Sequence, residues 1–529
     1  MAALPASRGF GSDPLWQRAQ AYLVRGRLGT ARQVLTAFQS AGRGSGVHAY
    51  LLAAQLALFD DWVRDAARLA LGAAQVASDD VEARCAVAGL LLETGETVAA
   101  RDCLDRVSLA DCGDALPLLH ASALRKQLHQ HVEALALLDR AKSLGDTSPM
   151  LRVMRGASLI ANGRLNEAEA EFAAALTVAP AGGRVAVQLV RLRRQTPERN
   201  YLAEIGRAAR LARPGSEDAA ALEFARYKTL EDLGRFDEAW QVLTRANALV
   251  RARLPDTFQA YRAALKRMVS VGLPTNRAAP AKPAGPAPIF IVGMPRSGTT
   301  LLERMLGHHS QVALAGELSD FSAQLRWAAD TRNLQTDAAM ARVGGLDHAE
   351  LGRRYLAQTQ WYARGRRFYI DKQPTKWLLA PVMHAALPGA PILHMLRDPM
   401  DSCFSNWRTY FGSAWAYSYD LDTLVTCYND YRRAMAHWHA LMPGAILDVE
   451  YSDLVNDPGA TLRKVFAFCG LEWEPGCSDI TRNAAPSGTV SAVQVRSPLR
   501  RDTDGQWRHY ADQLAAVADV LAMGSAEPA

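Results

Sequence analysis

The residues with the clearest chemical potential lie in one short loop, within the stretch IFIVGMPRSGTTLLERMLGHH that begins at Ile289. An apolar run at residues 289–292 predicts a buried strand, and apolar side chains at helical spacing in residues 299–307 predict an amphipathic helix. Loop amides and the positive end of a helix dipole favour an anion between them. The stretch therefore predicts a phosphate-type anion site. Its members are Arg296, Ser297, Gly298, Thr299 and Thr300.

The loop departs from the pattern of nucleotide-triphosphate P-loops, in which a lysine and then a serine or threonine follow the second glycine. Here Thr299 and Thr300 follow Gly298, and the cation is Arg296 inside the loop. The lysine that would reach β- and γ-phosphates is missing from the pattern. We therefore expect an anion without a triphosphate tail, and we expect no metal ion.

Three further polar residues, Lys372, Arg397 and Tyr451, stand directly after short apolar runs that predict strands. Helical stretches separate these runs, and such alternation is typical of a parallel sheet covered by helices on both faces. Ligands bind at the carboxyl ends of the strands in such sheets, so these residues are expected to converge with the loop. The predicted strands are residues 289–292, 367–370, 392–396 and 445–449, and the predicted helices are residues 375–387, 400–410, 421–442 and 458–469.

The first half of the chain has a different pattern, which is helical and repetitive. Small residues recur there at intervals of 33 to 35 residues, each after a turn and at the start of an amphipathic stretch. This period is that of the tetratricopeptide repeat, and about seven units are expected. The unit that ends at Pro180 fits best, with Gly156, Ala168, Phe172 and Ala175 at the expected offsets. The recurring residues are Ala31, Ala66, Ala99, Ala134 and Ala168.

A Pro- and Ala-rich stretch at residues 273–288 predicts a semi-rigid spacer between the two halves. It divides an all-α tetratricopeptide solenoid at residues 14–272 from an α/β domain at residues 289–522. Stacked repeats expose a concave groove. We expect the groove to dock a protein or peptide, and a passive scaffold is the alternative. Repeat arrays often pair, so a homodimer is one expected assembly.

Composition excludes several classes of protein. The formal net charge is +6 with 22% charged residues, and no block of like charge predicts binding to nucleic acid. The seven cysteines are an odd number without a CxxC pair, which argues against a disulfide framework or a zinc site and favours a reducing compartment. The N-terminus has no apolar core typical of a signal peptide, and no apolar run is long enough to span a membrane. A cytoplasmic protein is therefore expected.

Two motifs in order, PRSGTTLLERML and RDPMDSCFSNW, resemble the sulfotransferase family that uses 3′-phosphoadenosine 5′-phosphosulfate (PAPS). The likeness covers residues 288 to about 510. It is strongest to tyrosylprotein sulfotransferases and to bacterial sulfotransferases with N-terminal tetratricopeptide repeats. The resemblance implies a P-loop-type sulfotransferase domain with a central parallel sheet. PAPS would be the co-substrate and adenosine 3′,5′-bisphosphate (PAP) the product, with no metal.

The resemblance also implies donor-binding residues. The loop from Arg296 to Thr300 would bind the 5′-phosphosulfate, and Arg397 with Ser405 would bind the 3′-phosphate. Simple helix capping by the Arg–Asp–Pro turn is the alternative for Arg397. The late segment LRRDTDGQWRHY resembles the basic loop that closes over the 3′-phosphate, which places Arg500 or Arg501 there. Tyr451 resembles a tyrosine that stacks near the adenine.

Catalytic roles follow from the same resemblance. Glu317, in a Gly-Glu pair 21 residues after Arg296, resembles the base of the tyrosylprotein sulfotransferases. Lys372 resembles the lysine at the bridging oxygen, and Ser491 resembles a serine that assists the same charge. The residues left open as alternatives are His308 and His309 for the base, Lys376 for the lysine, and Ser487 and Ser497 for the serine.

The expected reaction transfers a sulfuryl group from PAPS to an acceptor hydroxyl, with Arg296, Glu317, Lys372 and Ser491 as catalytic residues. The Gly-Glu resemblance favours a protein tyrosine as the acceptor. A saccharide, lipid or small-molecule hydroxyl is the alternative. A kinase or a non-catalytic nucleotide-binding protein is a further alternative, and Thr299 in place of a lysine argues against the kinase.

Overall fold

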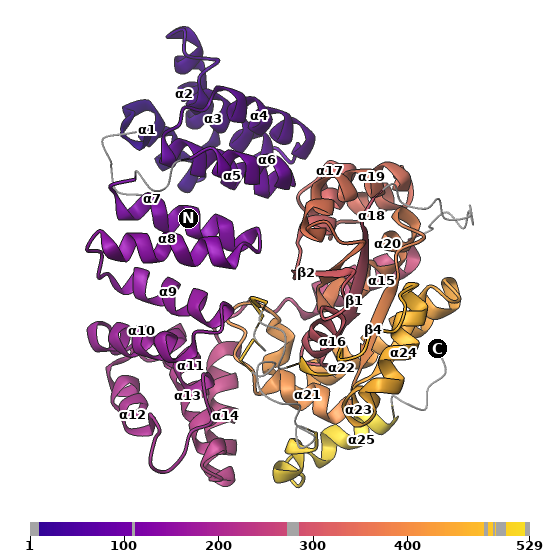
Figure 1. The fold of residues 1–529 in the computed structure, drawn as a ribbon. Helices are drawn as coiled ribbons and strands as arrows, with labels where there is room; N and C mark the ends of the chain where they lie inside the picture. The colour runs from indigo at the N-terminus through magenta and orange to yellow at the C-terminus, as the bar shows by residue number, and fades with distance from the viewer. Residues whose placement is uncertain are drawn as a thin grey trace. The chain divides into compact units, whose positions relative to one another are not determined.

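The computed structural model describes residues 10–107, 112–271, 285–480, 485–489, 492–493 and 504–523. Its first part is helical, and neighbouring helices pack in pairs that can be followed along the indigo-to-magenta part of the chain (Figure 1). Five of the helices, namely α1, α5, α7, α9 and α13, begin at a side chain that accepts a backbone N–H, as Asp80 and Ser148 do, which satisfies donors in the first turn. The helices are α1 (Pro14–Val24), α2 (Leu28–Ser40), α3 (Val47–Phe59), α4 (Val63–Val76), α5 (Val81–Thr94), α6 (Thr97–Asp105), α7 (Ala115–Gln127), α8 (His131–Ser143), α9 (Pro149–Ala161), α10 (Leu165–Val178), α11 (Gly183–Arg191), α12 (Leu202–Leu211), α13 (Glu217–Asp232), α14 (Phe236–Arg251) and α15 (Phe258–Ser270).

Buried small residues let the helices of each pair approach, as the repeat pattern predicts. Four of the five predicted alanines are buried, but Ala99 is not, and its neighbour Ala100 occupies the buried position. The alignment of that unit was therefore wrong by one residue, because two consecutive alanines fit the pattern almost equally well. Phe172 packs directly on Gly156, where an added Cβ would lie 2.5 Å from the ring.

The second part contains a parallel five-stranded sheet with the order β2-β3-β1-β4-β5. The central strand β1 is buried along its whole length, which explains its continuous apolar sequence. Residues Ile392–Leu396 form β4 as predicted, and the predicted strands at 367–370 and 445–449 are shifted by one or two residues. The strands are β1 (Ala287–Gly293), β2 (Val312–Gly316), β3 (Phe368–Lys372), β4 (Ile392–Leu396) and β5 (Ile446–Glu450).

Helices cover both faces of the sheet. One face packs against α16, α23 and α24 in a core that includes Ile291, Leu302 and Phe466. On the other face, α20 and α22 pack together, and Tyr431 of α22 contacts His394 of β4. The helices of this part are α16 (Thr299–Leu306), α20 (Ala380–Ala386), α21 (Pro399–Trp407), α22 (Leu421–Leu441), α23 (Tyr451–Asn456), α24 (Pro458–Cys469) and α25 (Ala515–Met523), with short 3-10 helices η3 (Pro374–Leu379) and η8 (Gln506–Tyr510).

The chain packs into two compact units that do not follow its linear order. One unit contains α1–α8 together with three helices inserted after Glu317, namely α17 (Asp320–Ala329), α18 (Asp337–Gly344) and α19 (His348–Thr359). The other contains α9–α16, the sheet and the remaining C-terminal helices. The last repeats therefore pack with the sheet domain, whereas the insert packs with the first repeats.

Buried polar contacts hold the insert on the repeats of its own unit. The Thr97 hydroxyl donates to Asp320 at 2.6 Å, and the Arg354 guanidinium pairs with Glu96 at 2.6 Å. The main chain of this repeat also contributes, since Gln324 donates to the carbonyl of Gly95 at 2.6 Å. Part of the repeat surface is therefore covered by the chain itself, and docking of a partner in the groove stays a prediction.

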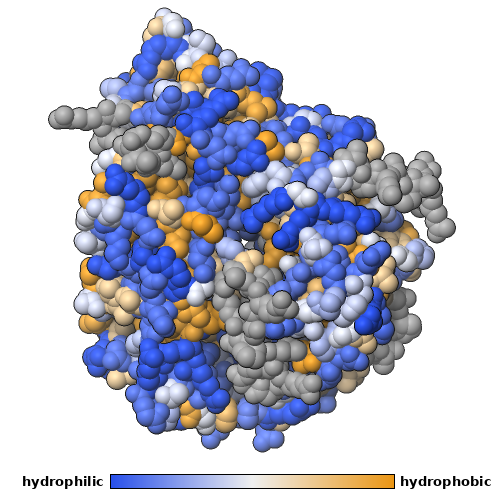
Figure 2. All heavy atoms as spheres, in the orientation of Figure 1, coloured by the Kyte–Doolittle hydropathy of each residue, from blue (hydrophilic) through white to orange (hydrophobic). Residues whose placement is uncertain are grey.

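Most of the predicted spacer at residues 273–288 lies outside the described residues, so the predicted domain limits stay a prediction. On the face drawn in Figure 2, hydrophilic side chains cover most of the surface and hydrophobic ones are scattered. Exposed apolar side chains such as Phe59, Val132 and Leu211 lie on different helices, and such scatter does not mark a docking surface. No helix in the described part is long and apolar enough to cross a membrane.

Candidate active site

Each of the five strands ends at a residue that was predicted for the site. In the order of the sheet these are Glu317 after β2, Lys372 at the end of β3, the loop after β1, Arg397 after β4 and Tyr451 after β5. The carboxyl ends of parallel strands meet at one edge of a sheet. The sheet order therefore explains why residues far apart in sequence come together.

The loop after β1 turns sharply and leads into α16. Gly298 has φ +105°, and a Cβ there would lie 2.5 Å from the ring of Tyr451, so only glycine fits both the backbone and the neighbour. Arg296 also has a positive φ of 68°, an uncommon conformation for a side-chain-bearing residue at a tight functional turn. The tyrosine ring thus packs directly against the predicted anion loop.

The loop fits a bound oxyanion. Thr299 and Thr300 are buried at the first turn of α16, where backbone N–H groups have no partner within the helix. The Ser297 hydroxyl is buried and has no hydrogen-bond partner among the described residues. A buried polar group of this kind is costly unless a ligand or water satisfies it. A bound oxyanion would supply acceptor oxygens at this place.

Arg397 is held from three sides. Its guanidinium donates to the carbonyl of Arg296 at 3.1 Å and to a carboxylate oxygen of Asp504 at 2.7 Å, and it lies over the Tyr451 ring at 4.8 Å. The Arg397 side chain is therefore directed toward the loop, as a 3′-phosphate ligand requires. In this structure the carboxylate of Asp504 is the anion that pairs with Arg397.

Ser405 lies two turns into α21. It is buried and lines a cavity at the carboxyl edge of the sheet. The helix begins at Asp398, whose carboxylate accepts the N–H of Asp401 at 2.9 Å. The carboxylate of Asp401 in turn accepts the N–H of Gly505 at 2.8 Å, which fastens the late segment to α21. The Arg–Asp–Pro turn therefore caps the helix through Asp398, which leaves Arg397 available for another role.

Glu317 and Lys372 form an ion pair between their side chains. The side chain of Lys372 is 0% exposed, whereas that of Glu317 is 41% exposed. The buried ammonium therefore holds a carboxylate that lines the cavity. The register of β2 shifts just before Glu317, between Leu314 and Gly316, and such an irregularity re-aims the following side chain. Glu303 of α16 lies 3.8 Å from the same ammonium. Burial raises the pKa of Glu303, although Lys372 acts in the opposite sense.

The alternatives for these two roles lie elsewhere. Neither Lys372 nor Lys376 is among the residues that line the cavity. Lys376 pairs with Asp371 in a buried contact, whereas Lys372 reaches Glu317, which does line the cavity. The His309 ring is buried, with Nε2 2.9 Å from the carbonyl oxygen of Glu472. His308, like His309, follows the end of α16 and is not among the lining residues. The geometry therefore favours Glu317 and Lys372.

A cavity of about 910 Å³ joins these elements within one packing unit. This volume lies in the range of small-molecule sites. The predicted residues that line the cavity are Arg296, Gly298, Thr299, Thr300, Glu317, Arg397, Ser405 and Tyr451.

Three predicted residues, Ser491, Arg500 and Arg501, lie outside the described residues, as does the alternative Ser497. The other serine alternative, Ser487, is buried, and its main-chain N–H donates to the carbonyl of Ala161 in α9 at 2.9 Å. Thr489, two residues on, lines the cavity. The segment that precedes Ser491 therefore reaches the site.

The sequence did not reveal that the repeats form one wall of this cavity. Helices α10, α11, α13 and α14 all contribute, and Arg191 at the end of α11 is one of the lining side chains. Arg408 at the end of α21 also lines the cavity and pairs with Glu231 of α13 at 2.9 Å. No local motif marks these arginines, because their contribution depends on how distant elements pack.

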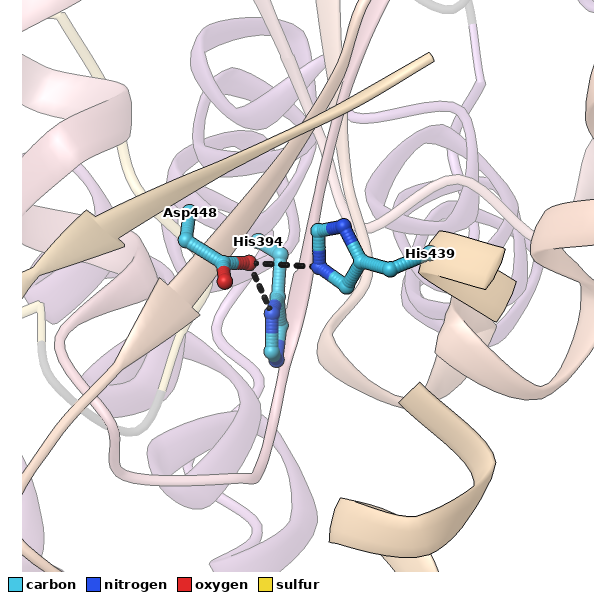
Figure 3. Close-up of side chains that lie close together, drawn as sticks. All are labelled: His394, His439 and Asp448. Carbon is cyan, nitrogen blue, oxygen red and sulfur yellow. Dashed lines mark hydrogen bonds and ion pairs between the residues drawn. The ribbon is translucent and has the colours of Figure 1, made fainter. Parts of the chain in front are cut away.

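A second polar cluster joins β4, β5 and α22 and does not line the cavity (Figure 3). Asp448 accepts from His394 at 2.7 Å and lies 2.9 Å from Nε2 of His439. The other ring nitrogen of His394 contacts the Tyr431 hydroxyl. One ligand atom from each of the three residues lies within 4.8 Å of the others, so the group could hold a metal ion. The hydrogen bonds also satisfy these groups without an ion.

Comparison with known proteins bears on the part of the chain that contains the sheet. Residues 288–475 match the model of the sulfotransferase family. Residues 288–475 therefore form a domain of the sulfotransferase family.

Relatives share parts of the chain. A stretch of 322 residues is 30% identical to an uncharacterized protein of Aquifex aeolicus and covers 58% of this chain and 42% of that protein. Nodulation protein NoeE of Sinorhizobium fredii is 33% identical over 137 residues, which cover 23% of this chain and 32% of that protein. The chain thus spans less than half the length of these two relatives.

Protein-tyrosine sulfotransferase 2 of Gallus gallus is 23% identical over 261 residues, which cover 45% of this chain and 69% of that protein. Among solved structures, the sulfotransferase domain of the Synechococcus PCC 7002 olefin synthase is 21% identical and matches with a TM-score of 0.32, covering 48% of this chain and 100% of that chain.

Proposed function

We propose that this protein transfers a sulfuryl group from PAPS to an acceptor hydroxyl, with Glu317 as the base. The observation that carries the proposal is the row of predicted site residues at all five strand ends: four of the ends line one cavity, and Lys372 at the fifth pairs with Glu317. A lone loop would support only anion binding. The loop, Arg397 and the Glu317–Lys372 pair together provide two anion sites and a base.

Donor binding divides between two places. The loop from Arg296 to Thr300 would hold the 5′-phosphosulfate, and the buried Ser297 hydroxyl would gain a partner there. Arg397 and Ser405 would hold the 3′-phosphate, and PAPS binding would exchange the Asp504 carboxylate for that phosphate. A planar guanidinium suits a phosphate because it offers parallel donors.

The transfer step follows from what these side chains offer. The acceptor oxygen forms a bond to sulfur while the bond from sulfur to the bridging oxygen breaks and PAP leaves. Glu317 takes the acceptor proton, and Lys372 positions Glu317 and offers positive charge near the leaving oxygen. Related phosphoryl transfers have loose transition states, so alignment and charge stabilisation supply most of the catalysis.

A protein tyrosine is the acceptor that we propose. The Gly316–Glu317 pair and the relatives named as protein-tyrosine sulfotransferases support it. A saccharide, lipid or small-molecule hydroxyl is the alternative.

The test supplies PAPS labelled in the sulfuryl group to the purified protein with extracts of cells. The expected result is label in a discrete product, and mass spectrometry then identifies the acceptor atom as tyrosine oxygen. Label on a sugar or lipid would refute tyrosine as the acceptor but would still support the proposed sulfuryl transfer. Absence of PAP binding in calorimetry would overturn the reaction itself.

A further inference from the structure

The wall of the cavity formed by the repeats is charged rather than merely apolar. It brings Arg191 from α11, Lys228, Glu231 and Asp232 from α13, and Phe236 from α14 to the same space as the loop after β1. All of these elements belong to one packing unit. The last repeats are therefore part of the site and not a separate attachment.

Most charges of this wall have partners of opposite sign. Lys228 pairs with Asp232, and Glu231 pairs with Arg408 at 2.9 Å. Although burial opposes its charge, Glu231 and Tyr227 raise the pKa of Arg408 above its ordinary value. The charge of Arg408 is thus compensated by the carboxylate of Glu231 within the fold.

Arg191 differs from these residues. In the part of the chain that the structure describes, no carboxylate pairs with Arg191, although its side chain lines the cavity. Burial, with a contribution from Arg408, lowers the pKa of Arg191 to about 10. Arg191 is partly exposed to the cavity rather than fully buried. A partly desolvated charge without a counter-charge is unfavourable, and an anionic ligand in the cavity would offset that cost.

The same cation acts on the loop. Burial lowers the pKa of Arg296 to about 9, and Arg191 is the next largest cause, ahead of Arg408 and Arg397. Arg191 and Arg296 are therefore neighbours that repel each other across the cavity. An oxyanion placed between two guanidinium groups would remove the repulsion and receive donors from both.

We propose that Arg191, supplied by the repeat helix α11, is an oxyanion-binding residue of the sulfotransferase cavity. The proposal rests on the proposed function for the identity of its ligand. The oxyanion is either the sulfuryl group of the donor or an anionic group on the acceptor, and both present the same sulfate-like chemistry. The repeats thereby contribute a binding side chain to the reaction.

The test titrates inorganic sulfate into the full-length protein saturated with PAP, and follows binding by calorimetry. Arg191→Gln removes the charge, and Arg191→Lys restores the charge without the planar fork. The matched control is Arg207→Gln, which changes an exposed arginine on α12 that pairs with Glu204 at 3.5 Å. Circular dichroism and thermal melting verify that each variant is folded.

We expect Arg191→Gln to weaken sulfate binding by at least about tenfold, as expected for loss of charged hydrogen bonds. Arg191→Lys should restore part of the affinity, and Arg207→Gln should leave it unchanged. PAP affinity should change by less than about twofold, because Arg397 and the loop bind the nucleotide.

A comparison of PAPS with PAP identifies the source of the oxyanion. If Arg191→Gln weakens PAPS but not PAP, the ligand is the sulfuryl group. If only sulfate binding weakens, the ligand is an anion of the acceptor. Equal sulfate affinity in wild type and Arg191→Gln overturns the proposal, as does an equal loss of PAP and sulfate affinity or a wild type that binds no sulfate. If PAP itself fails to bind, the proposed function fails, and titration of sulfate alone still tests Arg191.

Discussion

At the scale of single residues, the site is organised by charge pairs that hold reactive groups ready. Lys372 is buried and fixes the exposed carboxylate of Glu317. Arg397 is held by Asp504 on one side and by the Tyr451 ring on another. The proposed role of Glu317 as base and that of Arg397 as a donor-binding residue predict different outcomes for substitution.

Glu317→Gln should reduce turnover by about 10²–10⁴-fold, because an amide cannot accept the acceptor proton. PAP affinity should stay unchanged, since Glu317 is assigned no contact with the nucleotide. Initial rates with labelled PAPS and calorimetry with PAP provide the two measurements. Glu204→Gln, on an exposed face of α12, is the control. Turnover near that of wild type would refute the assignment of the base.

Asp504→Asn should tighten PAP binding by a factor of about 5, because the carboxylate that pairs with Arg397 is removed. The factor corresponds to about 1 kcal/mol, the upper range for a partly exposed ion pair. Calorimetry with PAP in low salt measures it. Weaker PAP binding in this variant would show that Asp504 supports the nucleotide site instead of competing with it.

At the scale of elements, the carboxyl edge of the sheet decides which residues meet. β2 lies beside β3, so Glu317 comes to Lys372, and β1 lies beside β4, so the loop comes to Arg397. The loop requires a positive φ at Gly298, which residues with a side chain rarely adopt. Between β4 and β5, His394 and Asp448 form a hydrogen bond that satisfies both side chains. Both features can be tested.

Gly298→Ala should lower the free energy of unfolding by about 1–3 kcal/mol, because the added Cβ would collide with Tyr451 and φ is +105°. PAP binding should weaken as the loop is displaced. The matched control is Gly206→Ala inside α12, where a Cβ meets open space. That variant should be more stable by up to about 1 kcal/mol, because alanine favours the helix. Denaturant unfolding compares the two, and a loss of equal size in both would contradict the structural argument.

His394→Gln should reduce the dependence of stability on pH between about pH 5 and 7. Burial lowers the pKa of His394 below its ordinary value, so the unfolded state binds more protons as pH falls. Native stability that is present above the unfolded pKa of about 6.5 is therefore lost below it. The variant should also be less stable at pH 8 by about 1–3 kcal/mol, because the amide cannot reproduce the two contacts of the imidazole ring, one nitrogen to Asp448 and the other to the Tyr431 hydroxyl. Urea unfolding from pH 5 to 8 checks both effects, and an unchanged slope would exclude His394 as a source of acid sensitivity.

At the scale of the whole molecule, each packing unit contains segments from both halves of the sequence. The insert α17–α19 lies within the sequence of the sulfotransferase domain but packs with the first repeats, and α9–α14 pack with the sheet. The insert begins three residues after Glu317. The repeats therefore serve first as an internal support of the second half, and docking of a partner stays a prediction for the surface that remains.

Thr97→Val should lower the free energy of unfolding by about 1–3 kcal/mol, because it leaves the buried carboxylate of Asp320 without its hydroxyl donor. Thr36→Val, at an exposed position of α2, should change stability by less than about 0.5 kcal/mol. Chemical unfolding of the full chain followed by circular dichroism provides the comparison. Equal stability of the two variants would show that the insert is not held through this contact.

By itself, the sequence determined the local features. Residues 289–307 specify a strand, an anion loop and a helix, because apolar period and glycine position act over a few residues. The 34-residue period revealed the paired helices, and the missing lysine argues against a triphosphate ligand, which stays a prediction. β2 escaped notice because its five residues, VALAG, carry little local signal and depend on pairing with β3.

The tertiary structure alone decided which distant residues meet. Strand order placed Glu317 beside Lys372, and packing of α11 against the sheet domain brought Arg191 into the cavity. It also placed α17–α19 on the first repeats instead of on the sheet. No local period encodes such contacts, because they arise from the burial of whole element faces and from charges separated by up to several hundred residues.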